Sequence, residues 1–470
     1  MRRSLQLLSK GTSFLTVKVA CTAELSDLKC LVVRTPREVL NIIALDSLLI
    51  IDKLIVNNER AAISIGNVNY LMISSYIMNL VLFPCMEHLD VTKLKSEYSQ
   101  RAVMLNLQYL EDVLVLKLPE NCPLLSTFTS DIKYIKKLEN LQLLKSCTND
   151  MIKELGENCP NMNYINISFS TDVENKCLPD LLNLKKITYL NISSTSISIN
   201  TYKIILNKLK LITNISWSEN YIEEILTDID EEILKNKVTF EGKIKAPKIL
   251  VERCPNIKSL TLETSEIIDL TPISEFCNLE NITLNGVNFA LCNLENIFRG
   301  LGSMLRDLYL KSVEDLKIST IIECCERLQS LSIENCKFSS DEINTVPSMS
   351  HFLSLTKLSL MSNTGDTWYL NNVKYYKNLK SLNADSVDGF DDDFFKEAFE
   401  NDAFKKLNEF AVRIGGRLSI RTANLLIDSC PDLKVIGYLH EWTGLNTLDT
   451  EKIVEGIWEN NYNLKVWLHG

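Results

Sequence analysis

The chain has 470 residues, of which 46% are hydrophobic and 23% are charged, with a net charge of −10 and a pI near 5.2. This much apolar material supports a continuous core and excludes a disordered chain. The negative balance argues against binding to a phosphate backbone, which needs a clustered basic face, and no run of about 18 apolar residues predicts a membrane span.

The first 24 residues are predicted to be an N-terminal segment or cap. Lys10 and Gly11 interrupt the apolar residues there, so the segment is a poor secretory signal. Its basic residues have no acidic neighbour before Glu24, which keeps a mitochondrial transit peptide as the alternative. Residues 25–470 are predicted to form a single repeat array.

One sequence unit recurs along the chain, with the pattern Cys-Pro-x-apolar-x-x-apolar-x-apolar. It is complete at 159–167, 254–262 and 430–438, and a weaker copy starts at Cys122. Copies without the proline end at Ile192, Leu284, Leu310, Ile333, Leu360, Ala384 and Val412, and earlier candidates end at Val33, Val56, Ile73 and Val91. Apolar and polar residues alternate at the end of each copy, which predicts a short strand with one buried face.

Helical spacing follows many of these predicted strands, as in 148–159 and 419–430. Thr148, Asn149 or Ser419 is expected to cap such a helix. Pro160, Pro255 and Pro431 are expected to end the helices just before the next strand. Asn, Cys or Thr residues after each strand, such as Thr195 and Cys336, are expected at the turn, where polar side chains satisfy backbone groups and Cys fills space.

The units repeat every 22–28 residues or so, which is the range of leucine-rich repeats. One unit cannot bury its apolar strand and helix faces alone, but stacked neighbours can. The sequence therefore predicts an α/β leucine-rich-repeat solenoid. A curved parallel sheet would lie on its concave side and helices on its convex side.

The 14 cysteines recur in phase with the repeat. In a long chain without a secretion signal, they are interpreted as small buried hydrophobic residues in a reducing compartment. No CxxC pair occurs, and the four histidines show no zinc-ligand spacing. No metal site and no cofactor are predicted.

The residues that alternate with buried strand positions should form an outward face. If Met162, Ile165 and Ile167 point inward, the residues between them point outward. This face would be polar with tyrosines, which suits hydrogen-bonded protein recognition. The predicted partner-binding residues are Tyr164, Asn166, Ser168, Tyr189, Asn191, Ser193, Asn214, Ser216, Thr261, Glu263, Thr283, Asn285, Asp307, Tyr309 and Lys311. The alternative is that these side chains only keep the strands soluble.

Some predicted outward positions near the two ends are apolar, which predicts an interface or a capping element there. They are Val32, Ile55, Met72, Leu114, Leu116, Val435 and Leu439. Several outward asparagines begin an N-x-[ST] triplet, and sugars at these sites would block the face in a secreted protein. These triplets start at Asn166, Asn191, Asn214 and Asn281. The cytoplasm or nucleus is therefore the expected compartment.

The segments 148–168 and 318–338 combine a helix, a cysteine and a strand. They resemble the cysteine-containing, ribonuclease-inhibitor-like repeats of F-box/leucine-rich-repeat proteins. The resemblance covers most of residues 25–470 and is strongest from about 120 to 440. It implies a substrate-recognition subunit of a cullin-RING (SCF-type) ubiquitin ligase, acting in ubiquitin-dependent protein degradation.

One departure from that family concerns the F-box itself, a short helical segment with a Leu-Pro opening and a later Trp that docks the ligase adaptor. Residues 35–54 echo only the opening, no Trp occurs before Trp217, and the segment is interpreted as repeat. Either an F-box lies upstream and the adaptor is a partner, or it has been lost, or the chain was never a ligase receptor. The alternative function is a ligase-independent scaffold or regulatory protein.

No GxSxG, HExxH or phosphate-loop pattern occurs in the sequence, so the common catalytic motifs are missing from it. His88 is expected at an exposed strand position, and His351 and His440 in loops. The acidic stretch 385–399 lacks calcium-loop spacing, so its aspartates are expected to cap a helix. Residues 413–421 (RIGGRLSIR) form either an anion-binding loop or, as we expect, a turn. The sequence thus predicts a non-enzymatic protein-binding module that binds neither nucleic acid nor membranes.

Overall fold

The chain divides into two compact units, the first made of Met1–Glu219 and Asp228–Ile233 and the second of Asn220–Thr227 and Leu234–Gly470. A computed structural model describes residues 47–56, 67–79, 81–82, 85–122, 124–263, 266–339, 354–365, 370–385, 389–413, 417–459 and 464–467.

The first unit contains a parallel sheet whose strands follow one another in chain order. The pairing is in register, so that Leu116, Leu141 and Ile165 lie side by side in consecutive strands. The described strands of this sheet are β1 (His88–Asp90), β2 (Val115–Leu118), β3 (Asn140–Leu143), β4 (Tyr164–Asn166) and β5 (Tyr189–Asn191).

Helices precede and connect these strands. Those with described bounds, where η marks a short 3-10 helix, are α5 (Asn67–Asn79), η1 (Val91–Lys93), α6 (Glu97–Asn106), η2 (Leu107–Tyr109), α7 (Leu125–Asp131), η3 (Ile132–Tyr134), α8 (Asn149–Asn158), η4 (Asn175–Cys177), α9 (Leu178–Leu181) and α10 (Ile199–Lys208). Strand β6 (Asn214–Tyr221) and helices α11 (Glu223–Thr227) and α12 (Glu231–Lys235) come from the stretch of chain in which the division falls.

The second unit repeats this arrangement, again with parallel strands in consecutive order. Its described strands are β7 (Thr239–Lys243), β8 (Ser259–Glu263), β9 (Asn281–Asn285), β10 (Asp307–Lys311), β11 (Ser330–Glu334), β12 (Lys357–Met361), β13 (Ser381–Asp385), β14 (Glu409–Arg413), β15 (Val435–Gly437) and β16 (Lys465–Trp467). Its helices are α13 (Pro247–Arg253), η5 (Thr271–Glu275), α14 (Leu294–Leu301), α15 (Ile318–Cys324), α16 (Leu370–Val373), α17 (Asp392–Glu400), α18 (Ile420–Ser429), η7 (Leu439–Glu441) and α19 (Thr447–Glu459).

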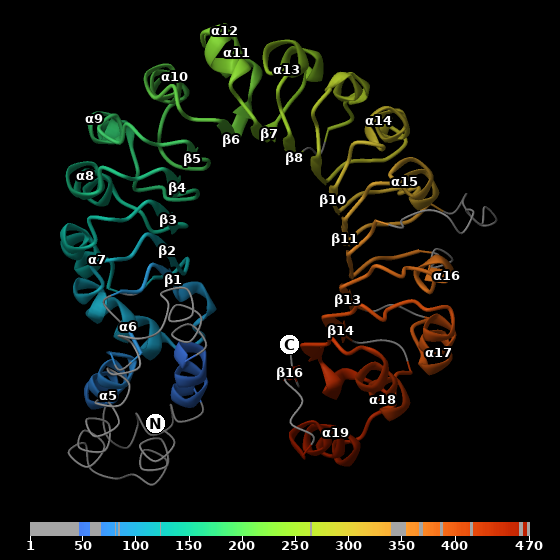
Figure 1. The fold of residues 1–470 in the computed structure, drawn as a ribbon. Coiled ribbons are helices and arrows are strands. Elements are labelled where there is room, and N and C mark those ends of the chain that lie inside the picture. Colours follow the sequence, from blue (N-terminus) through green and yellow to red (C-terminus); the bar gives the residue numbers. More distant parts are fainter. Residues whose placement is uncertain are drawn as a thin grey trace. The chain divides into compact units, whose positions relative to one another are not determined.

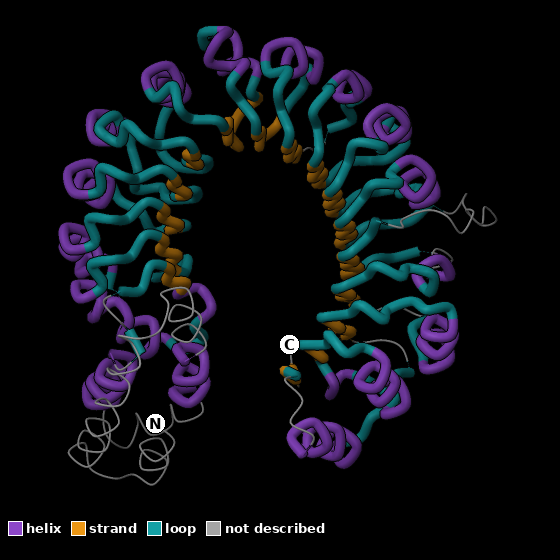
Figure 2. The backbone as a smooth tube through the Cα atoms, viewed as in Figure 1, coloured by secondary structure: helices purple, strands orange, loops and turns teal. Residues whose placement is uncertain are grey.

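Within each unit the strands line one side and the helices the other (Figures 1 and 2). The coil around β3 shows why: Leu141 and Leu143 alternate with half-buried residues along the strand, and Met151 and Leu155 of α8 face them from the helix side, all nearly inaccessible. Each coil buries its apolar residues against the next. The predicted leucine-rich-repeat solenoid architecture is confirmed.

The predicted helix boundaries are largely confirmed. The Thr148 hydroxyl accepts a hydrogen bond from the Met151 amide at the start of α8, and the Ser419 hydroxyl accepts one from the Arg421 amide at the start of α18. Helix α8 ends one residue before Cys159, and Pro160 follows. Helices α13 and α18 end in the same way before Cys-Pro pairs.

The prediction that turn cysteines only fill space is wrong for Cys336. Its sulfur lies 3.3 Å from the Val313 amide nitrogen, which donates to it, and 3.5 Å from the Leu310 carbonyl oxygen. Asn363, one coil on, accepts from the Cys336 amide at 2.9 Å and donates to the Ile333 carbonyl at 2.8 Å. The thiol therefore takes the place that an asparagine side chain occupies in the neighbouring coil.

The early strands of the predicted array are also wrong. The segments ending at Val56 and Ile73 are helical, at residues 47–56 and in α5, and the weaker copy at Cys122 leads into α7. The candidate ending at Val33 and the boundary after residue 24 lie outside the described residues. The first described strand is β1, as predicted for the copy ending at Val91.

A turn with left-handed backbone follows many strands at the same repeat position. The residues with positive φ there are Lys145, Phe169, Ser194, Gly286, Ser312, Asn335 and Ser362. Only one of them is glycine, the residue that favours this conformation. The stacked coils therefore impose the turn on side chains that disfavour it by about 1–2 kcal/mol each.

Candidate partner-binding faces

Each sheet has one face that the helices do not cover. We call these the first face and the second face. The first face consists of alternating strand residues of β1–β5, namely His88, Asp90, Val115, Lys117, Asn140, Gln142, Tyr164, Asn166 and Tyr189. The second face includes Thr261, Glu263, Thr283, Asn285, Asp307, Tyr309, Lys311, Ser332, Glu334, Ser359 and Asn383.

A pair of stacked tyrosines dominates the first face. Tyr164 of β4 and Tyr189 of β5 are register partners, and their ring centroids are 4.3 Å apart with planes at 5°. Both side chains are half-buried, and Asn140 lies beside Tyr164 in the ladder. The predicted outward orientation of Tyr164, Asn166 and Tyr189 is confirmed, whereas their contact with a partner stays a prediction.

Three predicted contact residues of this face are instead buried. Asn191, Ser193 and Ser168 are 4%, 6% and 4% exposed. The strands end at Asn166 and Asn191, and each asparagine oxygen accepts hydrogen bonds from the amide and hydroxyl of the serine two residues on. For Ser168 and Ser193 the prediction failed because it extended the strand alternation past the residue at which the chain turns. Asn191 lies within β5, but it is buried and its oxygen bonds to the turn.

Asn214 and Ser216 are also inaccessible, although strand alternation places them outward. The Asn214 side chain accepts from the Leu190 amide and donates to the Leu190 carbonyl, both at 2.8 Å. The Asn214 amide therefore makes the two hydrogen bonds to Leu190 of β5 that the backbone of a neighbouring strand would otherwise make. The Tyr202 hydroxyl accepts from the Ser216 amide at 3.1 Å, and the Tyr202 ring stacks on Trp217.

On the second face all seven predicted residues point outward. Asp307 and Glu263 are exposed, and Thr261, Thr283, Asn285, Tyr309 and Lys311 are half-buried. Strands β8–β11 pair in register, so these residues form continuous rows across the sheet. Their role in binding a partner stays a prediction.

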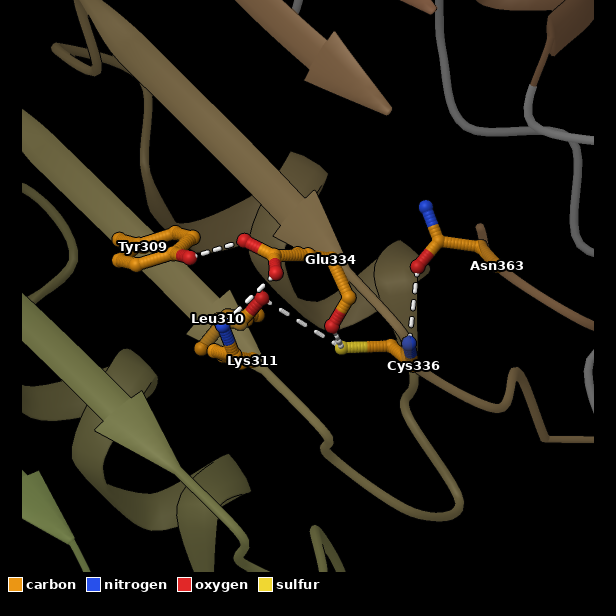
Figure 3. Close-up of polar contacts among 6 residues, drawn as sticks. All are labelled: Tyr309, Leu310, Lys311, Glu334, Cys336 and Asn363. Carbon is orange, nitrogen blue, oxygen red and sulfur yellow. Dashed lines mark hydrogen bonds and ion pairs between the residues drawn. The ribbon is translucent and has the colours of Figure 1, made fainter. Parts of the chain in front are cut away.

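Sequence reasoning missed Glu334, which connects two of the predicted residues (Figure 3). The Tyr309 hydroxyl donates to one oxygen of its carboxylate, and the Lys311 ammonium lies 2.7 Å from the other. Hydrogen bonds from Lys311 and Tyr309 lower the pKa of Glu334. Burial and the bond to Glu334 raise the pKa of Tyr309 to about 12. The three groups therefore form a fixed network in which the phenol stays protonated at neutral pH.

A second unpredicted contact lies near the end of this face. The guanidinium carbon of Arg413 lies 4.2 Å from the centre of the Tyr438 ring. Arg413 belongs to the segment 413–421, predicted as a turn with an anion-binding loop as the alternative, of which residues 414–416 lie outside the described residues.

Of the apolar residues predicted to face outward, some are buried and others are half-buried or exposed. Leu116 is buried because the buried and outward residues of β2 alternate one residue out of phase with the prediction. Ile55 and Leu439 are buried because they lie in helices and not in strands. Met72 is 56% exposed, but on helix α5. Leu114 and Val435 are half-buried, and Val32 lies outside the described residues.

The described histidines and Asp391 lie on separate elements. His88 is exposed on β1 as predicted, and His440 is exposed in the short helix η7. His351 lies outside the described residues. Asp391 caps α17 by accepting from the Phe394 amide at 2.8 Å, as expected for this stretch.

The described part of the chain offers neither a metal-binding cluster nor a membrane-spanning helix. It contains no group of three or more His, Cys, Asp or Glu side chains that could hold a metal ion. It also contains no helix with the length and apolar character needed to cross a bilayer.

Comparison with known proteins gives distant structural likenesses. No protein-family model matches the chain, and no curated protein matches it. An internalin from Listeria monocytogenes has 16% identity and a TM-score of 0.40, over 73% of this chain and 89% of that chain. The yeast Rad7 and Elc1 complex has 13% identity and a TM-score of 0.42, over 82% and 92%. A Leptospira interrogans leucine-rich-repeat protein has 16% identity and a TM-score of 0.35, over 78% and 80%.

Proposed function

We propose that this chain is a protein-interaction module without catalytic activity, and that its partners bind the exposed sheet faces. The observation that carries the proposal is the stacked pair of Tyr164 and Tyr189 on the first face. Tyrosine is enriched among the residues that dominate binding energy at interfaces. Since the two rings already hold each other in place, binding would cost little of their conformational entropy.

The surroundings of the pair fit a protein partner. The amide side chains of Asn140, Gln142 and Asn166 lie beside the rings, and none of them carries a net charge. An aromatic centre with a hydrogen-bonding surround is the usual composition of a non-obligate interface.

The test compares two double variants of the full chain. Tyr164→Ala with Tyr189→Ala removes the rings, whereas Tyr164→Phe with Tyr189→Phe keeps the stack. Tagged proteins are purified from the source cells, and co-purifying proteins are quantified by mass spectrometry. We expect the alanine variant to lose at least one specific partner and the phenylalanine variant to retain most of it.

Stability needs a parallel measurement because the rings are half-buried and stacked. Loss of the stack should cost about 1 kcal/mol beyond the lost apolar area. Circular dichroism should therefore show a folded protein with a modestly lower Tm. An alanine variant that is folded and keeps every partner would contradict the proposal for this face.

More specifically, we propose that the chain is the substrate-recognition subunit of a cullin-RING (SCF-type) ubiquitin ligase. The resemblance of segments 148–168 and 318–338 to the repeats of such receptors supports this role. The helices at 47–56 and in α5 add to it, because a helical segment preceding the repeats is where such receptors carry the F-box. Ile50 and Met72, each 56% exposed, are apolar residues of these helices available to an adaptor.

The ligase proposal has its own experiment. Purification of the full chain should recover a cullin and its adaptor, and Ile50→Glu with Met72→Glu should abolish that recovery. The same variant should retain proteins bound at the first face. Partners that bind the faces while no ligase subunit is ever recovered would instead support the alternative, a ligase-independent scaffold.

A further inference from the structure

Lysines line the turns that lead from the helices into β3, β5 and β6 of the first unit. We call Lys136, Lys137, Lys185, Lys186 and Lys210 the basic edge, and all five are exposed. Strands β3, β4 and β5 pair in register, so equivalent positions of adjacent turns lie about 4.8 Å apart. The chain as a whole carries a net charge of −10, so this edge is a local reversal of sign.

Two of these lysines are held in place by neighbouring turns. The Lys186 ammonium donates to the Asn161 side-chain oxygen at 2.6 Å, and the Lys137 ammonium forms an ion pair with Asp112 at 2.5 Å. In the adjoining turn into β2 the equivalents of Lys136 and Lys137 are Glu111 and Asp112, so acidic residues border the edge at this end. The ammonium groups of Lys136, Lys185 and Lys210 make no hydrogen bond or ion pair within the part of the chain that the structure describes.

Two carboxylates lie close to the edge in sequence. Glu139, at the end of the turn into β3, accepts a hydrogen bond from the Asn163 amide group at 3.5 Å. Glu157 belongs to α8, which precedes the turn that contributes Pro160 and Asn161. Taken turn by turn, the equivalent exposed positions hold no acidic residue; they are Lys136, Lys137, Pro160, Asn161, Lys185, Lys186, Lys210 and Leu211.

Exposed apolar side chains accompany the lysines. The Tyr134 ring is 44% exposed, with the Lys133 ammonium 5.0 Å from its centre. Leu211, next to Lys210 at the other end of the edge, is 55% exposed. A ligand lying along the edge would therefore meet cations flanked by apolar surface.

We propose that the basic edge binds a short acidic segment of a partner protein that also carries an apolar residue. From the turn into β3 to the turn into β5 there are two strand spacings, about 10 Å, and the Thr213 amide before β6 donates to the Thr188 carbonyl before β5 at 2.8 Å, so the edge matches a short extended segment of about four residues. Tight nucleic-acid binding relies on six to ten or so phosphate contacts, which need a longer track. The overall negative charge also disfavours a long polyanion.

The edge is distinct from the first face. Its residues precede the strands, whereas the face consists of strand residues such as Tyr164 and Tyr189. Substitutions on the edge therefore leave the stacked pair intact, and failure here would not bear on the function proposed for that face.

The test measures binding of the full chain to a fluorescent peptide made of glutamates with one leucine and one phenylalanine, by anisotropy at low salt. The edge variant is Lys136→Gln, Lys185→Gln and Lys210→Gln. The matched control is Lys258→Gln, Lys380→Gln and Lys434→Gln, which removes the same charge from exposed turn residues of the second unit. We expect the edge variant to bind roughly tenfold more weakly, since three exposed charge pairs are lost, and the control to change less than about twofold.

Further binding measurements show which results would contradict the proposal. A peptide with glutamine in place of glutamate should not bind, and raising the salt concentration should weaken the acidic peptide. Equal losses in the edge and control variants would overturn the proposal, because they would show a non-specific charge effect. Tighter binding of a single-stranded oligothymidine of equal charge would also overturn it, in favour of nucleic acid.

Discussion

Lys237 occupies a core position of its coil. The pairing of β7 with β8 and of β8 with β9 makes Ile257 and Leu279 its equivalents in the next two coils. All three side chains are 0% exposed. Burial lowers the pKa of the Lys237 ammonium to about 8 from its ordinary 10.5, with the nearby Cys254 as a minor opposing influence. The charged lysine therefore destabilises the fold at neutral pH.

The size of this effect follows from the shift in pKa. Each pKa unit corresponds to about 1.4 kcal/mol, so burial of the charge costs about 3 kcal/mol at pH 7. Below pH 8 both the folded and unfolded states carry the proton and the full cost applies. Between pH 8 and 10.5 the folded state loses its proton first, so the unfolded state binds more protons and the penalty falls, to about 1 kcal/mol at pH 9.5.

Lys237→Met keeps an unbranched side chain and removes the titration. Its loss of polar contacts gives an offset that does not depend on pH, whereas the charge penalty does. We therefore expect the free energy of unfolding of the variant relative to the wild type to fall by about 2 kcal/mol from pH 7 to pH 9.5. Ionisation of cysteines in the unfolded state affects both proteins equally and cancels.

Urea denaturation at the two pH values, followed by circular dichroism, measures this difference. Lys258→Met is the matched control, since it removes an exposed lysine from the next turn. It should show no comparable change with pH. A difference between Lys237→Met and wild type that is constant within about 0.5 kcal/mol would refute the reasoning, because the ammonium would then not be desolvated.

Three other predictions concern glycines, a helix cap and cysteines. Gly156→Ala in α8 should destabilise the protein in thermal denaturation, because the new Cβ would lie 2.7 Å from the Asp180 carbonyl oxygen. Gly456→Ala in α19 should instead stabilise it by about 1 kcal/mol, because no atom lies within 4 Å of the new Cβ. Thr148→Ala removes the cap of α8 and should lower the free energy of unfolding by about 1 kcal/mol, measured by urea denaturation. Iodoacetamide at pH 8 should label the exposed Cys277 in the native protein but not the buried Cys159 or Cys254, whose pKa values burial raises to about 12, as peptide mass spectrometry would show.

Much of the architecture was predictable because the repeat fixes both strand phase and helix position. From Cys159 onward the Cys-Pro units mark where a helix ends, and the apolar alternation after them marks the strand. Before β1 this guide is missing. Leu48, Ile51 and Ile55 are buried on one side of a helix, but a short apolar run does not distinguish a helix from a strand by periodicity alone.

The partner faces were only partly predictable, because side-chain contacts between coils decide what is accessible. Asn214 follows the outward alternation but is buried, with its side chain hydrogen-bonded to Leu190 of the preceding coil. Glu334 could be recognised as a bridge only once its register beside Lys311 was known. Such contacts depend on which residues the stacking aligns, and spacing within one repeat does not contain that information.

The position held by Tyr164 and Tyr189 shows whether the fold requires an aromatic residue there. In the other strands of the first unit the equivalent residues are His88, Val115 and Asn140, and all of these coils stack in the same register. The coil therefore accepts a cationic, aliphatic or amide side chain at this point without change of architecture. The architecture therefore does not require an aromatic residue there, and the stability that the stacked pair adds is separable from the binding role proposed for it, which the alanine and phenylalanine variants test.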